Sequence, residues 1–120
     1  MWQPIPPRIM RSTATVKVCI GVDLYQNQIY QNYTVNRVHI QPEERMVKSS
    51  DNTDQQLSGT LYVDARRSTP ALDWRAMLAN AHSLGGDMRV VIRGVEYTVL
   101  TAEGLRDGND RLHHWEIGVK

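Results

Sequence analysis

Apolar and polar residues alternate along several stretches of the chain, a pattern typical of strands with one buried face. The clearest stretch spans residues 14–24, and its apolar face would consist of Ala14, Val16, Val18, Ile20, Val22 and Leu24. The opposite face would carry Thr15, Lys17, Cys19, Gly21 and Asp23. A second strand is predicted over residues 29–40, where the apolar positions change from odd to even numbers between Val35 and Val38. A β-bulge near Asn36 and Arg37 would produce this change of phase.

The rest of the chain predicts further strands and one helix. Strand patterns cover residues 57–64, 88–93, 95–101 and 112–119, and the middle two form a hairpin around Arg93-Gly94. A helix is predicted over residues 72–83, capped by Thr69 or Asp73 and ended by Gly85-Gly86. One apolar stripe of this helix comprises Trp74, Met77, Leu78 and Ala81. Residues 105–111 form a turn-rich link. About six strands and one short helix predict a mainly β fold, either a small antiparallel β-barrel or a sandwich.

Two segments fit neither pattern. Residues 1–10 contain Pro4, Pro6 and Pro7, which disfavour both helix and sheet pairing, so we expect an extended N-terminal arm. Residues 41–56 hold only two strongly apolar side chains, Met46 and Val47, so we expect a long polar loop that a partner orders.

Composition narrows the class of protein. A chain of 120 residues suits one domain, and its net charge of +1 offers no bulk electrostatic case for nucleic-acid binding. The single cysteine, Cys19, excludes an intramolecular disulfide and fits a reducing compartment. The first ten residues lack the apolar run of a signal peptide, and no segment reaches the roughly 20 apolar residues of a membrane helix.

The terminal strand holds the most conspicuous candidate for chemistry, the pair His113-His114. Neighbouring residues on a strand point to opposite faces, so these two imidazoles cannot easily bind the same metal ion. His114 and Glu116 share a face, but nothing in the sequence marks a third ligand. We expect His113 and Trp115 on the buried face with Ile117 and Val119, and His114 and Glu116 on the outer face.

No other constellation indicates catalysis. Cys19 has no recognisable activating base, and the glycines fit neither a P-loop nor a dinucleotide-binding spacing. We therefore expect no enzymatic activity, no catalytic residues, no cofactor and no metal site.

The order of these elements resembles the small minor capsid proteins of tailed bacteriophages, of the head-closure (stopper) or head–tail connector type. The residues that carry the resemblance are Tyr33-Thr34-Val35-Asn36-Arg37-Val38, Gly59-Thr60-Leu61-Tyr62-Val63-Asp64, Ser68-Thr69-Pro70-Ala71, Ile92-Arg93-Gly94-Val95-Glu96-Tyr97-Thr98-Val99 and Leu112-His113-His114-Trp115-Glu116-Ile117. The resemblance as a whole extends from about residue 14 to the end of the chain, and the terminal strand is its most specific part.

The resemblance implies a structural protein of the virion, assembled in the host cytoplasm. Such proteins form a ring of copies below the portal or adaptor protein, and a tail terminator or tail tube protein docks beneath. The expected subunit contacts are Trp2, Ile5, Arg66, Arg67, His114 and Glu116. The expected channel loop, with non-specific contact to packaged DNA and none to a membrane, includes Glu43, Glu44, Arg45, Met46, Val47 and Lys48.

Two other classes stay open. A small β-barrel that binds nucleic acid, or serves as an adaptor, would need exposed aromatic and basic residues on one strand face. Tyr25, Tyr30, Tyr33 and Arg37 are the local candidates for such a face. A metal-dependent enzyme would contain stoichiometric zinc.

Overall fold

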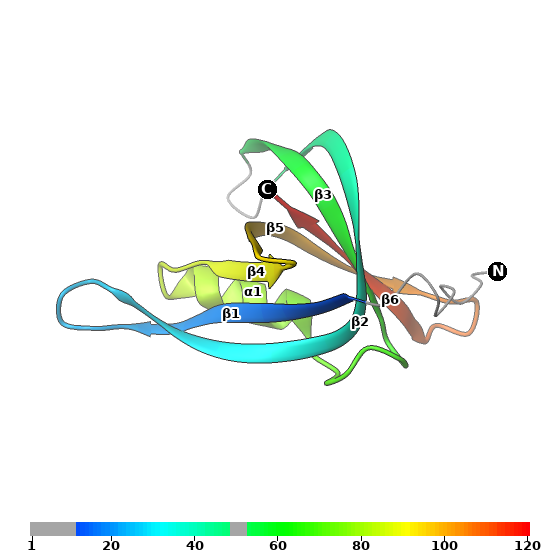
Figure 1. Ribbon diagram of the computed structural model, residues 1–120, viewed down its shortest axis with the longest axis horizontal. Helices are drawn as coiled ribbons and strands as arrows, with labels where there is room; N and C mark the ends of the chain where they lie inside the picture. Colours follow the sequence, from blue (N-terminus) through cyan, green and yellow to red (C-terminus); the bar gives the residue numbers. More distant parts are fainter. Residues whose placement is uncertain (1–11, 49–52) are drawn as a thin grey trace.

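Six antiparallel strands form a closed barrel in a computed structural model that describes residues 12–48 and 53–120 (Figure 1). The order around the barrel is β1-β2-β3-β6-β5-β4, and β1 pairs with β4 to close it. The elements are β1 (Ser12–Val22), β2 (Gln28–Lys48), β3 (Asp54–Asp64), α1 (Trp74–Ser83), β4 (Met88–Ile92), β5 (Val95–Arg106) and β6 (Leu112–Val119). The predicted mainly β class, with six strands and one helix, is confirmed. The expected N-terminal arm, with Trp2 and Ile5, lies outside the described residues.

The core fills the barrel with side chains from all six strands and from α1. Fully buried members include Val16, Leu61, Trp74 and Ile117. The helix packs against β5, β1 and β4, and its buried stripe contains Trp74, Leu78 and Ala81. Asp73, one of the two predicted caps, accepts a hydrogen bond from the backbone N–H of Ala76 at 3.1 Å.

The predicted bulge in β2 is present. Ser12 pairs with Val38 and Ala14 with Val35, so Asn36 and Arg37 on β2 lie opposite the single residue Thr13 on β1, and β2 has one extra residue there. Arg37 adopts a positive φ of 60°. The bulge lets Val35 and Val38 both point into the core, where each is fully buried.

A bulge in β1 that the alternation does not predict reverses the faces of its second half. Cys19 pairs with Tyr30 and Gly21 with Ile29, which leaves Ile20 as the extra residue. Cys19, expected on the polar face, is therefore fully buried, whereas Ile20 is 50% exposed. Beyond the bulge the apolar side chains no longer face the core, so the expectation for the second half of this strand was wrong.

The expected loop at residues 41–56 was also wrong. Residues 41–48 continue β2, residues 54–56 begin β3, and Met46 pairs with Gln56 and Lys48 with Asp54. Hydrogen bonds between β2 and β3 satisfy the backbone N–H and C=O groups of these residues, so the pairing does not require a buried apolar face. A two-stranded ribbon with solvent on both sides needs no apolar alternation, so its sequence resembles that of a polar loop.

Candidate functional site

The hairpin formed by β1 and β2 extends far beyond the barrel (Figure 1). Its end exposes apolar side chains to solvent. Leu24 is 96% exposed and Tyr25 85% exposed, and both lie in the turn between the strands. Three more exposed apolar residues lie on the two strands beside this turn: Ile20, Val22 and Ile29. We call these five residues, with Leu24 and Tyr25 included, the hairpin tip. Large apolar side chains grouped in solvent typically mark a surface that contacts another protein.

Hydrogen bonds hold the turn at the hairpin tip in one conformation. The Asp23 carboxylate accepts from the backbone N–H groups of Tyr25, at 2.8 Å, and Asn27, at 2.9 Å. The Asp23 N–H donates to the Asn27 carbonyl at 2.9 Å, which closes the loop. The backbone N–H donor at Asn27 is the main reason that the pKa of Asp23 is lowered, so the carboxylate stays ionised. The turn therefore presents Leu24 and Tyr25 outward as a preorganised pair.

A polar cluster ties the base of this hairpin to the start of β4. The Tyr30 hydroxyl donates to Asp87 Oδ1 at 2.5 Å, and Arg89 Nε donates to Asp87 Oδ2 at 3.0 Å. The Asp87 N–H donates to the side chain of Gln28 at 2.9 Å. Burial, together with the Asp87 hydrogen bond, raises the pKa of Tyr30 to about 12. The hairpin is thus anchored on one side by this cluster and on the other by its pairing within the sheet.

The hairpin formed by β2 and β3 contains all the residues expected in a channel loop, but in paired strands. Arg45 lies 3.1 Å from Glu43, and Lys48 lies 2.9 Å from Asp54. Glu43 also accepts a hydrogen bond from Thr60 at 2.8 Å. Glu44 and Met46 are exposed, Met46 by 63%, whereas Val47 is half-buried. This ribbon therefore offers mixed charge and one exposed apolar side chain.

The two histidines of β6 lie on the predicted faces, but His114 on the outer face is more deeply buried than His113. His114 shares the outer face with Glu116 as expected, since its Nε2 lies 2.9 Å from Glu116 Oε2, but His114 is only 4% exposed. His113 is half-buried, and its Nδ1 lies 2.7 Å from Nδ1 of His114. The Tyr62 ring, 6.3 Å from that of His114, helps to cover it. A buried His114 is not available as a surface contact, so that expectation was wrong. Trp115, Ile117 and Val119 are buried as predicted.

The outer face beside β6 brings together only some of the expected contact residues. Burial, followed by the charges of Glu116 and Glu43, raises the pKa of Tyr62. Tyr62 pairs with Glu116 across β3 and β6. Arg66 and Arg67 are exposed in the turn after β3, where their backbone N–H groups donate to Asp64 Oδ1 at 2.7 and 3.0 Å. Because Asp64 pairs with His114, this turn lies at the end of β6 where that strand begins. Trp2 and Ile5 lie outside the described residues.

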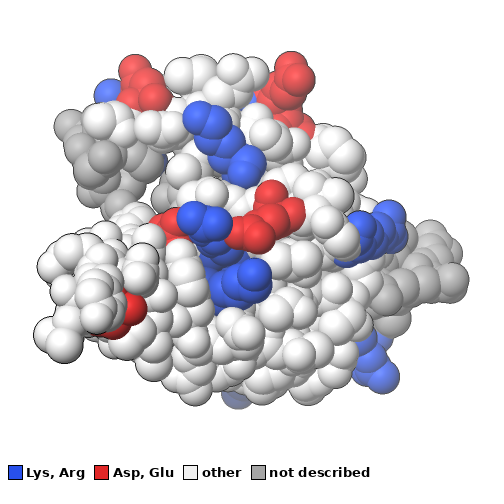
Figure 2. Space-filling view, turned by 60° about the vertical axis from the view of Figure 1, so that its left-hand side comes forward, with Lys and Arg blue, Asp and Glu red and all other residues white. Residues whose placement is uncertain are grey.

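Metal and nucleic-acid sites find little support in the described residues. Across residues 12–48 and 53–120, no three His, Cys, Asp or Glu side chains are grouped to hold a metal ion. Figure 2 shows basic and acidic side chains interleaved on one face, without a continuous basic track for a phosphate backbone. Among the tyrosines considered for base stacking, Tyr30 and Tyr33 pack against the core, and only Tyr25 is largely exposed.

No family model matches the chain, and no curated protein matches it. In the described part of the chain, no helix has the length and apolar character needed to cross a membrane.

The residues of the hairpin tip are the functional candidates that the alternation misses. Ile20, Val22 and Leu24 continue the apolar pattern of β1 and were therefore expected in the core. The available signal was local: Gly21 permits a bulge, and Asp23 with Asn27 favours a turn. Those residues place the end of β1 before Leu24.

Proposed function

We propose that this chain is a structural protein of the head–tail junction in a tailed bacteriophage, of the head-closure or connector type. In this proposal, copies of the chain form a ring below the portal or adaptor protein. The ring closes the filled head and presents a surface to a tail terminator or tail tube protein. The chain itself catalyses no reaction. The resemblance of its strand motifs supports the proposal, together with the geometry of the two hairpins.

The hairpin tip is the observation that carries the proposal. A protein that acts alone gains nothing from placing Leu24 and Tyr25 in solvent, where they cost solubility. A protein that joins neighbours needs such a group, rigid and well separated from its own core. The tip belongs to one end of an elongated molecule measuring 48 × 28 × 27 Å. A contact from this end to a different surface of the next copy is head-to-tail, and head-to-tail contacts generate rings when the rotation closes.

The β2–β3 hairpin takes the place of the expected channel loop in this proposal. A paired ribbon projects a fixed set of side chains, whereas a loop must be ordered by its partner. Arg45 and Lys48 each have an acidic neighbour, so the ribbon would contact packaged DNA weakly and without sequence preference. Weak contact suits a channel through which DNA must later pass.

Immunogold labelling tests the location. Phage particles whose genome encodes this chain would be labelled with an antibody against it, and viewed by negative-stain electron microscopy. Gold at the single vertex between head and tail is expected. Gold spread over the shell, or none on particles that contain the chain by mass spectrometry of disrupted virions, would contradict the proposal.

Solution experiments separate the alternative classes. If the chain were a nucleic-acid-binding module, the purified monomer would bind single-stranded DNA with an affinity that falls steeply with salt. A junction protein should instead associate with itself or with portal and tail proteins, and bind DNA weakly. Zinc in a one-to-one ratio by metal analysis would favour the metal-dependent class.

A further inference from the structure

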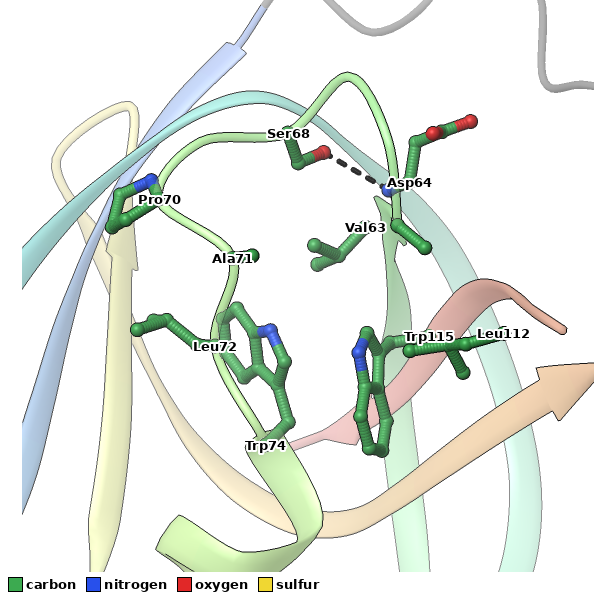
Figure 3. A pocket seen from close by; sticks show the side chains of 10 residues that line it. Val63, Asp64, Ser68, Pro70, Ala71, Leu72, Trp74, Leu112 and Trp115 are labelled. Atoms are coloured by element: carbon green, nitrogen blue, oxygen red, sulfur yellow. Dashed lines mark hydrogen bonds between the residues drawn. The ribbon is translucent and has the colours of Figure 1, made fainter.

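An open groove of about 240 Å³ lies between α1 and β5. Its apolar walls include Leu78 and Ala79 of the helix and Leu100 and Ala102 of the strand. The cavity beside Trp74, at the start of the same helix, measures about 40 Å³ and has room for little more than water (Figure 3). The groove is much larger. Since a cavity of about 150 Å³ already holds a benzene ring, the groove has room for an aromatic and an aliphatic side chain together.

Basic side chains give this groove a positive edge. Lys48, Arg75 and His82 line it beside the apolar residues. Lys48 lies 2.9 Å from Asp54, which offsets its charge. Within residues 12–48 and 53–120, the Arg75 guanidinium has no carboxylate at ion-pair distance. A partner that fits the groove therefore combines apolar side chains with a carboxylate placed next to them.

The hairpin tip of another copy of the chain has this combination. Leu24 supplies an aliphatic side chain and Tyr25 an aromatic one. The Asp23 carboxylate directly precedes them, and its hydrogen bond from the Tyr25 N–H, at 2.8 Å, fixes it beside the pair. The pKa of Asp23 is lowered, mainly by the backbone N–H of Asn27, so this carboxylate is ionised. The turn thus presents two apolar side chains and one fixed negative charge.

A contact between the hairpin tip and the groove would join two molecules. The β1–β2 hairpin projects away from the barrel, whereas the groove lies on the barrel beside α1 (Figure 1). Leu24 is 96% exposed, so its own molecule does not cover it. The tip and the groove are different surfaces of the chain, and each copy has both. Such a contact is head-to-tail, the kind that generates a closed ring when the rotation between copies allows.

We propose that the groove between α1 and β5 binds the hairpin tip of a second copy of this chain. Leu24 and Tyr25 pack against the apolar walls of the groove, and the Asp23 carboxylate pairs with the Arg75 guanidinium. The inference rests on the self-association that the proposed function requires, and it adds the surface that receives the tip.

Charge substitution in the full-length protein tests the contact by sedimentation equilibrium. Arg75→Glu would place a carboxylate opposite Asp23 and should weaken self-association at least about tenfold. Adding Asp23→Asn should restore part of the affinity, because the amide oxygen still accepts the hydrogen bonds of the turn but carries no charge. The matched control is Arg111→Glu, an exposed arginine beside the start of β6, which should associate like the wild type.

Cross-linking locates the contact independently of affinity. Gln26→Cys and Ala79→Cys proteins, mixed and treated with a short bismaleimide, should form a dimer linked between positions 26 and 79. Cys19 is fully buried, so it does not compete for the reagent. Val95→Cys in place of Ala79→Cys should give no mixed dimer, because Val95 is exposed in the β4–β5 hairpin and does not line the groove.

The outcomes separate this inference from the proposed function. Wild-type association in Arg75→Glu, or no link between positions 26 and 79 in protein that self-associates, would show that the tip binds elsewhere. A wild type that stays monomeric at every concentration would also overturn the inference, and immunogold labelling would still test the virion location. A tenfold loss in Arg75→Glu combined with gold spread over the shell would support the contact and contradict the head–tail location.

Discussion

Polar substitution at the hairpin tip should abolish association while leaving the fold intact. In the double variant Leu24→Ser and Tyr25→Ser, almost no buried surface is lost by the monomer, because these side chains are 96% and 85% exposed. Surface changes of this kind alter the free energy of unfolding by about 0.5 kcal/mol or less. In an assembly that buries both side chains, each contributes about 2 kcal/mol. Losing about 4 kcal/mol per contact weakens association about a thousandfold.

Sedimentation equilibrium and light scattering over a wide protein concentration range measure this effect, and urea unfolding measures the fold. The wild type should form oligomers, alone or with a portal or tail protein, at concentrations where the variant stays monomeric. Val95→Ser is the control, because Val95 is an exposed apolar residue, at 49%, that lies in the β4–β5 hairpin and not at the hairpin tip. It should associate like the wild type. Equal association of all three proteins would refute the role of the hairpin tip. A large fall in the urea midpoint of the double variant would refute the premise that the Leu24 and Tyr25 side chains are exposed in the monomer.

Three further predictions concern stability. In Gly86→Ala, the new Cβ would meet Cys19 Cβ at 2.5 Å, so urea unfolding should show a loss of about 1–3 kcal/mol, and an unchanged midpoint would contradict the packing. Leu61→Ala, at a fully buried position, should cost about 2–5 kcal/mol with an unchanged denaturant slope; a smaller loss would mean that the barrel collapses around the cavity. Because the folded pKa of Tyr30 is raised to about 12 from an ordinary value of 10.0, its stabilisation is fully present below pH 10 and is lost as the pH rises through 12. Tyr30→Phe should flatten this part of the stability profile, and absorbance titration should show a late-titrating tyrosine in the wild type that Tyr30→Phe lacks. A stability profile that Tyr30→Phe leaves unchanged would contradict the Asp87 contact.

The amino-acid sequence by itself determined the class of the fold and most of its elements. Period-two patterns located all six strands, and the helical stripe beginning at Trp74 located α1. The phase change between Val35 and Val38 revealed a bulge, because two neighbouring core positions cannot otherwise lie an odd distance apart on one face. These features depend on neighbours in the sequence, so they can be recognised without the tertiary structure.

Only the tertiary structure showed where these patterns fail to predict which side chains are buried and which segments pair. The apolar run of β1 continues past the barrel, and an unpredicted bulge at Ile20 turns it from core to surface. His114 lies on the outer face, as its position in the strand indicates. Tyr62 and Glu116 lie beside its ring and shield it from solvent. The polar stretch after residue 40 pairs with β3 although it has no buried face to reveal a strand. In each case the burial or pairing of a residue depends on which distant segment lies beside it. The alternation along a single strand does not identify that neighbouring segment.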